Sequence, residues 1–250
     1  TQAKTLFPYT TLFRSRDPAK AALTVGQLSF YDRFMRVKVS GKANIPHNRP
    51  TLVVANHASH LDMGLAKYAL GSYGQDIVAL AATDYFFKNK WMRVYFENFT
   101  NMAALDRRSG LRKALEQAGE HLSSGKTVLL FPEGTRTPDG QMREFMPLIG
   151  HLSLNYQIDI LPLYLGGTFK ALPKGAKVPI PRRREVEVRI GPPLTVAQFE
   201  QRTAGMKRAD AYREVAKLAH RAVATLRDGG QLDLEREAAE LEKAKQAGKS

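Results

Sequence analysis

A histidine and an aspartate separated by four residues, His57 and Asp62 in the run NHASHLD, have the types and spacing needed for proton transfer. The apolar residues 51–55 read as a buried strand before the histidine, and a helical pattern begins near Leu61. A carboxylate in the first turn of a helix can reach back to one imidazole nitrogen, which fixes the tautomer and leaves the other nitrogen to take a proton. The spacing therefore favours His57 as a proton acceptor that Asp62 orients.

Two other interpretations of this run stay open. In the first, Asn56, Ser59 or Asp62 caps a helix while His57 and His60 lie at the surface. In the second, His57, His60 and Asp62 ligate a metal ion, and the other nitrogen ligands come from histidines that form no tight pair, at positions 47, 121, 151 and 220. Because those histidines are scattered along the chain, we expect no metal site.

A second stretch whose residues could bind or react is LLFPEGTRTPDG, residues 129–140. A strand ends there at Pro132 and is followed by Glu133, Gly134, Thr135 and Arg136. Glycine lets the backbone approach a ligand closely, and the planar guanidinium of arginine matches a phosphate group. An anion-binding loop is the hypothesis, and a plain turn with Asp-Gly at positions 139–140 at its tip is the alternative.

A third candidate is the run NMAALDRR, which ends in Arg107 and Arg108 and precedes a helical pattern from Leu111. Basic residues at the end of a strand could join the same phosphate pocket. The alternative is that this arginine pair lies on a solvated surface.

The elements that must position these residues alternate between short apolar runs and helical patterns. This alternation predicts an α/β fold with a mixed, largely parallel sheet flanked by helices. Amphipathic helices are expected at residues 111–122 and 209–226. Strands are expected at residues 35–39, 51–55, 77–80, 127–131, 160–164 and 185–190.

The bulk composition narrows the class of protein. The chain has 250 residues, of which 43% are hydrophobic, and contains no cysteine, so disulfides and a cysteine nucleophile are excluded. The net charge of +14 implies an anionic partner, which nucleic acid, an anionic membrane surface or a phosphorylated substrate would each provide. No apolar run reaches the roughly 18 residues of a membrane-spanning helix.

Three parts are expected along the chain. Residues 1–15 include TLFPYTTLFRS, which resembles the translation of a sequencing-library adapter, so we expect an unstructured artefact and a missing native amino terminus. Residues 16–228 form the predicted domain, and residues 229–250 a charged tail that is helical or disordered. Within the domain, residues 172–184 combine three prolines with five basic residues, which favours a surface loop. We expect its basic residues, with Lys170 and the nearby apolar Phe169 and Leu172, to rest on anionic lipid headgroups, and a plain soluble basic loop is the alternative.

Taken in order, NHASHLD, NMAALDR, FPEGTR and ILPLYLGG resemble the four motifs of the glycerolipid acyltransferases of the lysophosphatidic acid acyltransferase type. The resemblance spans roughly residues 37–191. It implies that His57 is the general base and Asp62 its partner. It also implies that Arg107 and the block from Glu133 through Gly134 and Thr135 to Arg136 bind the substrate phosphate, and that Pro162 is a structural proline near the acyl-binding side.

The chain departs from the family pattern at two places. It reads Phe-Met-Pro-Leu at residues 145–148 where members often have Phe-Lys-x-Gly, and the second motif begins with Asn101 where glycine is common. Both departures bear on the identity of the acceptor more than on the type of reaction.

The resemblance implies an O-acyltransferase of phospholipid biosynthesis that uses no bound cofactor. Its co-substrate would be acyl-CoA or an acyl carrier protein, and its acceptor a lysophosphatidic acid-like lysophospholipid. We expect a peripheral location on the cytoplasmic face of an anionic membrane surface. The alternatives are the same chemistry on glycerol 3-phosphate or another lysolipid, a metallohydrolase, and a basic module that binds nucleic acid without catalysis, a partner that we do not expect because no known signature supports it.

Overall fold

The computed structural model describes residues 26, 28–75, 77–82, 102–105, 110–173 and 184–237. A helical segment at residues 28–34 leads into the first strand. The elements that follow are β1 (Met35–Ser40), a 3-10 turn (Lys42–Asn44), β2 (Leu52–Ala55), α2 (Asp62–Leu70), α3 (Ser72–Gln75), β3 (Val78–Ala82), β4 (Met102–Leu105), α6 (Gly110–Ser123), β5 (Val128–Leu130), α7 (Leu148–Tyr156), β6 (Ile160–Gly166), α8 (Thr168–Ala171), β7 (Arg184–Ile190), α9 (Val196–Thr203) and α10 (Arg208–Arg227).

The described strands form one seven-stranded sheet in the order β1-β7-β6-β2-β5-β3-β4. Strands β6, β2, β5, β3 and β4 run parallel to their neighbours, whereas β7 pairs with β6 in the antiparallel sense and β1 runs parallel to β7. The predicted mixed, largely parallel sheet is therefore confirmed. Because β2, β5 and β6 are parallel neighbours, the segments that follow them emerge at the same edge of the sheet.

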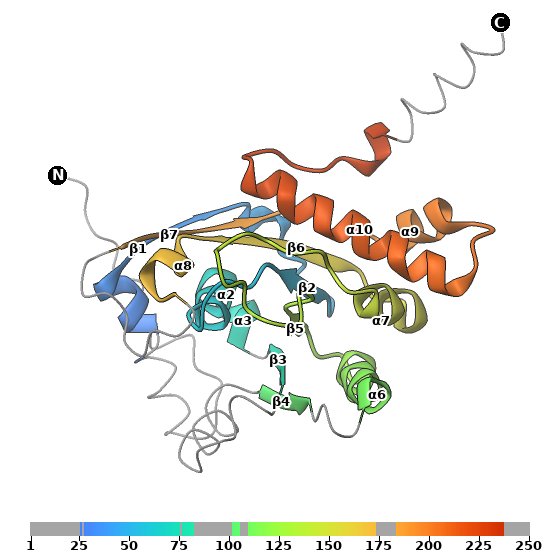
Figure 1. Ribbon diagram of the computed structural model, residues 1–250, viewed down its shortest axis with the longest axis horizontal. Coiled ribbons are helices and arrows are strands. Elements are labelled where there is room, and N and C mark those ends of the chain that lie inside the picture. The colour runs from blue at the N-terminus through green and yellow to red at the C-terminus, as the bar shows by residue number, and fades with distance from the viewer. Residues whose placement is uncertain are drawn as a thin grey trace, which may run out of the picture.

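Helices cover both faces of the sheet, so its central strands are buried on both sides (Figure 1). Alternate residues of β2 point to opposite faces, with Leu52 and Val54 in one apolar cluster and Val53 and Ala55 in the other. Helices α6, α7, α9 and α10 pack on the first face, and α2 on the second. All four residues of β2 are fully buried, which is why this strand reads as a continuous apolar run.

The predicted strands and helices are all present, with bounds that differ by at most two residues. The sequence interpretation gave no bounds for β4, and it did not include the helical segment at residues 28–34 or helices α3, α7, α8 and α9. Helix α7 packs on the sheet and contacts both α6 and α10, so much of its surface is buried and its sequence lacks the polar face that marks an amphipathic helix. Strand β4 is only four residues long, and the sequence indicated it only as a strand end before the arginine pair.

The chain after α10 packs on the domain. Leu232 and Leu234 are buried in the same apolar cluster as α9 and α10. Glu237 forms ion pairs with Arg202 and Arg221, which lie on those two helices. The predicted boundary between domain and charged tail at residue 228 therefore falls inside the packed part of the chain, because the two leucines bury apolar surface beyond it. Residues 1–25 and 238–250 lie outside the described residues.

Candidate active site

The sheet topology brings the first and second chemical stretches together. His57 follows the carboxyl end of β2, and Glu133 follows the carboxyl end of β5. These strands are parallel neighbours in register, with Val54 opposite Leu130, so the two segments leave the sheet side by side. In open α/β sheets, ligands bind at the carboxyl ends of the strands. The candidate site lies at this edge.

His57 and Asp62 form a hydrogen-bonded pair. Nδ1 of His57 lies 2.9 Å from Oδ2 of Asp62. The same oxygen accepts hydrogen bonds from the backbone amides of Ala58 at 2.6 Å and Ser59 at 2.7 Å. The aspartate side chain is fully buried, and the histidine side chain is 17% exposed. Because a carboxylate needs a donor, Nδ1 carries the proton in this pair, and the lone pair of the imidazole lies on Nε2.

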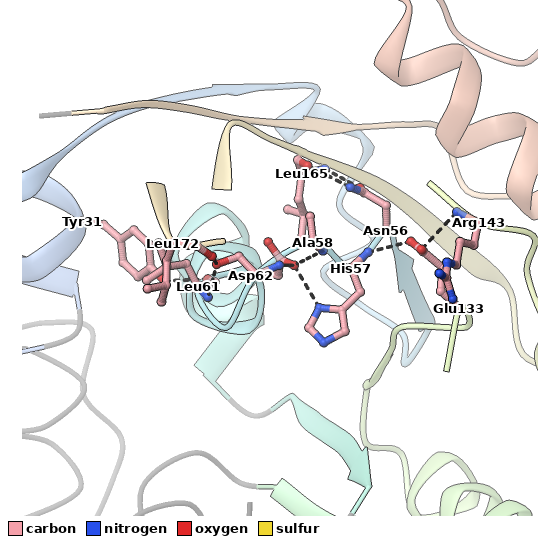
Figure 2. Close-up of polar contacts among 11 residues, drawn as sticks. Tyr31, Asn56, His57, Ala58, Leu61, Asp62, Glu133, Arg143, Leu165 and Leu172 are labelled. Atoms are coloured by element: carbon pink, nitrogen blue, oxygen red, sulfur yellow. Dashed lines mark hydrogen bonds and ion pairs between the residues drawn. The ribbon is translucent and has the colours of Figure 1, made fainter. Parts of the chain in front are cut away.

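The turn that carries this pair is fixed to three other parts of the fold (Figure 2). The side-chain amide of Asn56 donates to the carbonyl of Leu165 on β6 and accepts from its amide. The hydroxyl of Ser59 donates to the carbonyl of Leu172, which follows α8. The hydroxyl of Tyr31 in the first helical segment donates to the carbonyl of Leu61. These hydrogen bonds hold the turn between the strand and helix α2.

One face of the His57 ring is covered by an aromatic side chain. The rings of His57 and Phe131 are stacked, with centroids 4.2 Å apart and an angle of 18° between their planes. Phe131 directly follows β5, so its position also depends on the pairing of β2 with β5. The stacked ring limits rotation of the imidazole and keeps water from that face.

The side chain of Glu133 contacts the backbone of His57, on the side away from Asp62. Oε1 accepts a hydrogen bond from the amide of His57 at 2.8 Å, and Oε2 accepts one from the amide of Arg143 at 3.1 Å. Figure 2 shows Asp62 and Glu133 on either side of His57. Burial raises the pKa of Glu133 to about 7; the two backbone amides oppose this rise, and the negative charge of Asp62 adds to it.

Arg136 is buried, with 6% of its surface exposed, and its charge acts on the second histidine of the turn. Burial, together with the charges of Arg136 and His57, lowers the pKa of His60 to about 4, and the charge of Asp62 opposes this effect. His60 is therefore neutral at physiological pH. The arginine thus places a permanent positive charge near the turn that holds the His57–Asp62 pair.

The rest of the loop after β5 is compact. Gly134 has a positive φ of 73°, a backbone conformation that favours glycine. A Cβ there would come within 2.8 Å of the flexible end of the Met146 side chain. Thr135 is exposed. The amide of Thr137 donates to the carbonyl of His57 at 2.9 Å. Asp139 accepts from the Thr137 hydroxyl, so the predicted Asp-Gly turn is also present, at the tip of the same loop.

The structure brings together most of the predicted site residues. His57, Asp62 and Glu133 are joined by hydrogen bonds, and the 133–136 block follows β5 at the same edge of the sheet. Arg107 and Arg108 lie outside the described residues. The helix-cap interpretation is wrong, because α2 begins at Asp62 without a side-chain cap and the amides that Asp62 accepts come before the helix. The side chain of His57 is also only 17% exposed. Within the described ranges, no group of three His, Asp or Glu side chains is arranged to hold a metal ion.

Several residues of the site were given no such role in the sequence interpretation. Phe131, Thr137 and Arg143 contact His57 or Glu133 across strands, so no local spacing in the sequence indicates them. Asn56 and Ser59 were considered only as helix caps, although each bonds to a segment more than a hundred residues away. Their place beside His57 on a strand-to-helix turn was the available signal.

The basic loop predicted to meet a membrane is described only at its ends. Residues 174–183 lie outside the described residues, Lys170 is exposed, and Arg184 begins β7. Leu172 is buried, with 6% of its surface exposed, so it cannot rest on lipid headgroups as expected. Phe169 is half-buried and packs near Gly140. In the described part of the chain, no helix is both long enough and apolar enough to span a bilayer.

Comparison with known proteins identifies the family. Residues 36–166, more than half of the chain, match the sequence model of the Acyltransferase family. The chain belongs to this family, which confirms the resemblance seen in the four motifs.

Similar proteins carry more specific names. The chain is 31% identical over 145 residues to a 1-acyl-sn-glycerol-3-phosphate acyltransferase of Chlamydomonas reinhardtii, a match covering 57% of this chain and 42% of the relative. It is 29% identical to the chloroplastic enzyme LPAT1 of Arabidopsis thaliana, covering 58% of this chain and 40% of that one. The chain thus spans less than half the length of these two curated relatives.

A solved structure matches over a larger part. The crystal structure of the 1-acyl-sn-glycerophosphate acyltransferase PlsC from Thermotoga maritima is similar with a TM-score of 0.62 and 27% sequence identity. The match covers 87% of this chain and 86% of that protein. The likeness therefore extends over nearly the whole fold of both chains.

Proposed function

We propose that this protein transfers a fatty acyl chain from a thioester to the hydroxyl group of lysophosphatidic acid in phospholipid synthesis. Family membership and the names of its relatives support the type of reaction and the acceptor. The observation on which the proposal depends is the hydrogen bond from Nδ1 of His57 to buried Asp62. This bond turns the imidazole into a base whose available nitrogen is Nε2.

In the proposed reaction, Nε2 of His57 takes the proton of the acceptor hydroxyl as its oxygen attacks the thioester carbonyl carbon. The carboxylate of Asp62 stabilises the imidazolium that forms. The tetrahedral intermediate then collapses with cleavage of the carbon–sulfur bond. The imidazolium returns its proton to the leaving thiolate, so the products are an ester and a free thiol, and no acyl-enzyme is needed.

The donor is proposed to be acyl-CoA or an acylated carrier protein, because each supplies the thiolate leaving group that this cysteine-free chain cannot provide. No resident cofactor is required for the chemistry. Holding the two substrates together is then the main task of the site, since a good leaving group needs little further activation.

The acceptor phosphate is proposed to bind near Arg136. Its guanidinium is buried close to the catalytic turn, and Gly134 leaves backbone accessible in the same loop. Thr135 and Arg107 remain further predicted contacts. A phosphate held by a fixed cation would place the acceptor hydroxyl in front of Nε2 of His57.

An assay of purified protein with radiolabelled acyl-CoA against a panel of acceptors tests this function. We expect the highest kcat/KM with lysophosphatidic acid, and less with glycerol 3-phosphate or lysophospholipids whose phosphate is esterified. Comparison with acylated carrier protein identifies the donor. Acylation of glycerol 3-phosphate alone would change the assigned acceptor, and no transfer to any acceptor would overturn the proposal.

We further propose that the protein works as a peripheral protein on the cytoplasmic face of a membrane. The acceptor and product are lipids, and the net charge of +14 favours anionic headgroups. Exposed Lys170 extends the basic segment of residues 174–184. Flotation with vesicles should show more binding when anionic lipid is included, and equal binding to neutral vesicles would contradict this location.

A further inference from the structure

The backbone of His57 is held at both ends by the loop that follows β5. Its amide donates to Oε1 of Glu133 at 2.8 Å, and its carbonyl accepts a hydrogen bond from the amide of Thr137 at 2.9 Å. Both partners come from a segment more than 70 residues away in the sequence. His57 follows β2 in the chain, but its backbone is therefore held by the loop that follows β5.

Glu133 also connects this arrangement to a third segment. Its second oxygen, Oε2, accepts a hydrogen bond from the amide of Arg143 at 3.1 Å. The residue is buried, with 8% of its surface exposed. Each carboxylate oxygen thus receives one backbone N–H, so the side chain links the catalytic turn to the far end of its own loop. The sequence motif had suggested that Glu133 contacts the substrate phosphate instead.

Both oxygens of Glu133 already accept backbone N–H groups, and its ionised form would repel a phosphate. We therefore propose that Glu133 is a positioning residue that fixes the backbone of His57 so that Nε2 faces the acceptor hydroxyl, and that it does not contact the phosphate. This inference rests on the proposed role of His57 as the base. Small displacements of a catalytic group are costly, since about 1 Å can reduce a rate by about a hundredfold.

Glutamine is the informative substitution at this position. It has nearly the same shape as glutamate, but it offers one carbonyl oxygen and one NH2 group. One of the two backbone amides, of His57 or of Arg143, would then face another donor. The predicted result is a shifted His57 backbone in a protein that still folds.

The experiment compares Glu133→Gln with Glu144→Gln, which removes the same charge from an exposed side chain of the same loop. We expect kcat of the Glu133 variant to fall by about a hundredfold while the acceptor KM changes by less than about threefold. The Glu144 variant should keep both values. A large rise in acceptor KM with kcat intact would overturn the positioning role and restore the phosphate contact.

A second readout needs no variant. In isotope-labelled wild-type protein, the amide proton of His57 should shift with pH at the same midpoint as the side-chain carboxyl carbon of Glu133. The ring of His57 and the carboxylate of Asp62 also lie near this amide, so only a shift that follows the carboxyl carbon of Glu133 supports the contact; Arg143 stays charged throughout. An unresponsive His57 amide would overturn the inference even if the glutamine variant failed to fold.

The two proposals fail in different ways. If the wild-type protein acylates no acceptor, the proposed function fails, and the nuclear magnetic resonance titration alone decides whether Glu133 holds the His57 backbone. If the wild-type protein is active and only acceptor binding depends on Glu133, the function stands and the positioning role is wrong.

Discussion

Two neighbouring segments build the site, the turn of residues 56–62 after β2 and the loop of residues 131–143 after β5. Each contains one buried carboxylate, Asp62 in the turn and Glu133 in the loop. Asp62 bonds to the ring of His57 and to amides of its own turn. Glu133 bonds to backbone amides of both segments. One carboxylate orients the side chain of His57, and the other holds its backbone.

The carboxylate that orients the ring of His57 is near it in the sequence, whereas the carboxylate that holds its backbone is far from it. Asp62 lies only five positions from His57, so the short turn between β2 and α2 is enough to bring it to the ring. Glu133 lies 76 positions away and reaches the amide of His57 only because β2 and β5 are paired. Side-chain chemistry is thus encoded locally, while the position of the turn depends on the sheet.

Replacing His57 itself should have the largest effect. His57→Ala removes the proposed base, so we expect kcat to fall by about 100- to 10,000-fold, the usual contribution of general base catalysis. Circular dichroism should show a folded protein. His47→Ala, which changes an exposed histidine outside the site, is the control and should remain active. Normal turnover by a folded His57→Ala protein would remove the His57–Asp62 pair from the mechanism.

Asp62→Asn tests the first half of the comparison. The asparagine oxygen can take the place of Oδ2 and still accept the amides of the turn and the Nδ1 proton of His57, but the negative charge that stabilises the imidazolium is lost. We expect a loss of roughly ten- to a hundredfold in kcat, corresponding to one charge-assisted hydrogen bond. The ring nitrogen chemical shifts of His57 should report the weaker hydrogen bond at Nδ1. Unchanged shifts together with full activity would separate Asp62 from the orientation of the ring.

Arg136→Ala tests whether the loop after β5 also binds substrate, in addition to holding the His57 backbone through Glu133. Loss of the buried guanidinium should raise the acceptor KM by about tenfold, while the donor KM stays nearly constant. Arg208→Ala changes an exposed arginine on α10 and serves as the control. If the donor KM rose in place of the acceptor KM, the phosphate should be assigned to another residue.

The smallest expected effect is on stability and concerns the raised pKa of Glu133. Because its pKa is about 7 in the folded protein and near 4.5 when unfolded, the folded state holds an extra proton between these pH values. The free energy of unfolding of the wild type should therefore fall, relative to Glu133→Gln, as pH rises from 4.5 to 7. The decrease should be about 1 to 2 kcal/mol after allowance for solvent screening.

Denaturant unfolding of both proteins across this pH range measures the difference. Glu144→Gln should follow the wild type, since that side chain is exposed in both states. A difference that grows in the opposite direction would mean that the folded protein favours the ionised carboxylate, and the role of burial at Glu133 would have to be revised.

Much of the fold was predictable because its central strands are apolar throughout and its two long amphipathic helices have a clear period. The pair of His57 and Asp62 was predictable for a related reason, since both residues belong to one strand-to-helix turn. Helix α7 was not predicted, because a helix buried on most sides lacks the polar face that reveals the period. Leu172 was misjudged because the sequence does not show that it packs against the apolar side of the fold.

The sequence by itself determined the residue types, their order and the local contact between an imidazole and an aspartate, because these depend on spacing within a single turn. Only the tertiary structure decided that Glu133 reaches the backbone of His57 and that Phe131 covers its ring. Those contacts depend on which strands are neighbours in the sheet. The physical reason is that pairing of β2 with β5 joins segments far apart in the chain, and no local pattern specifies the partner of a strand.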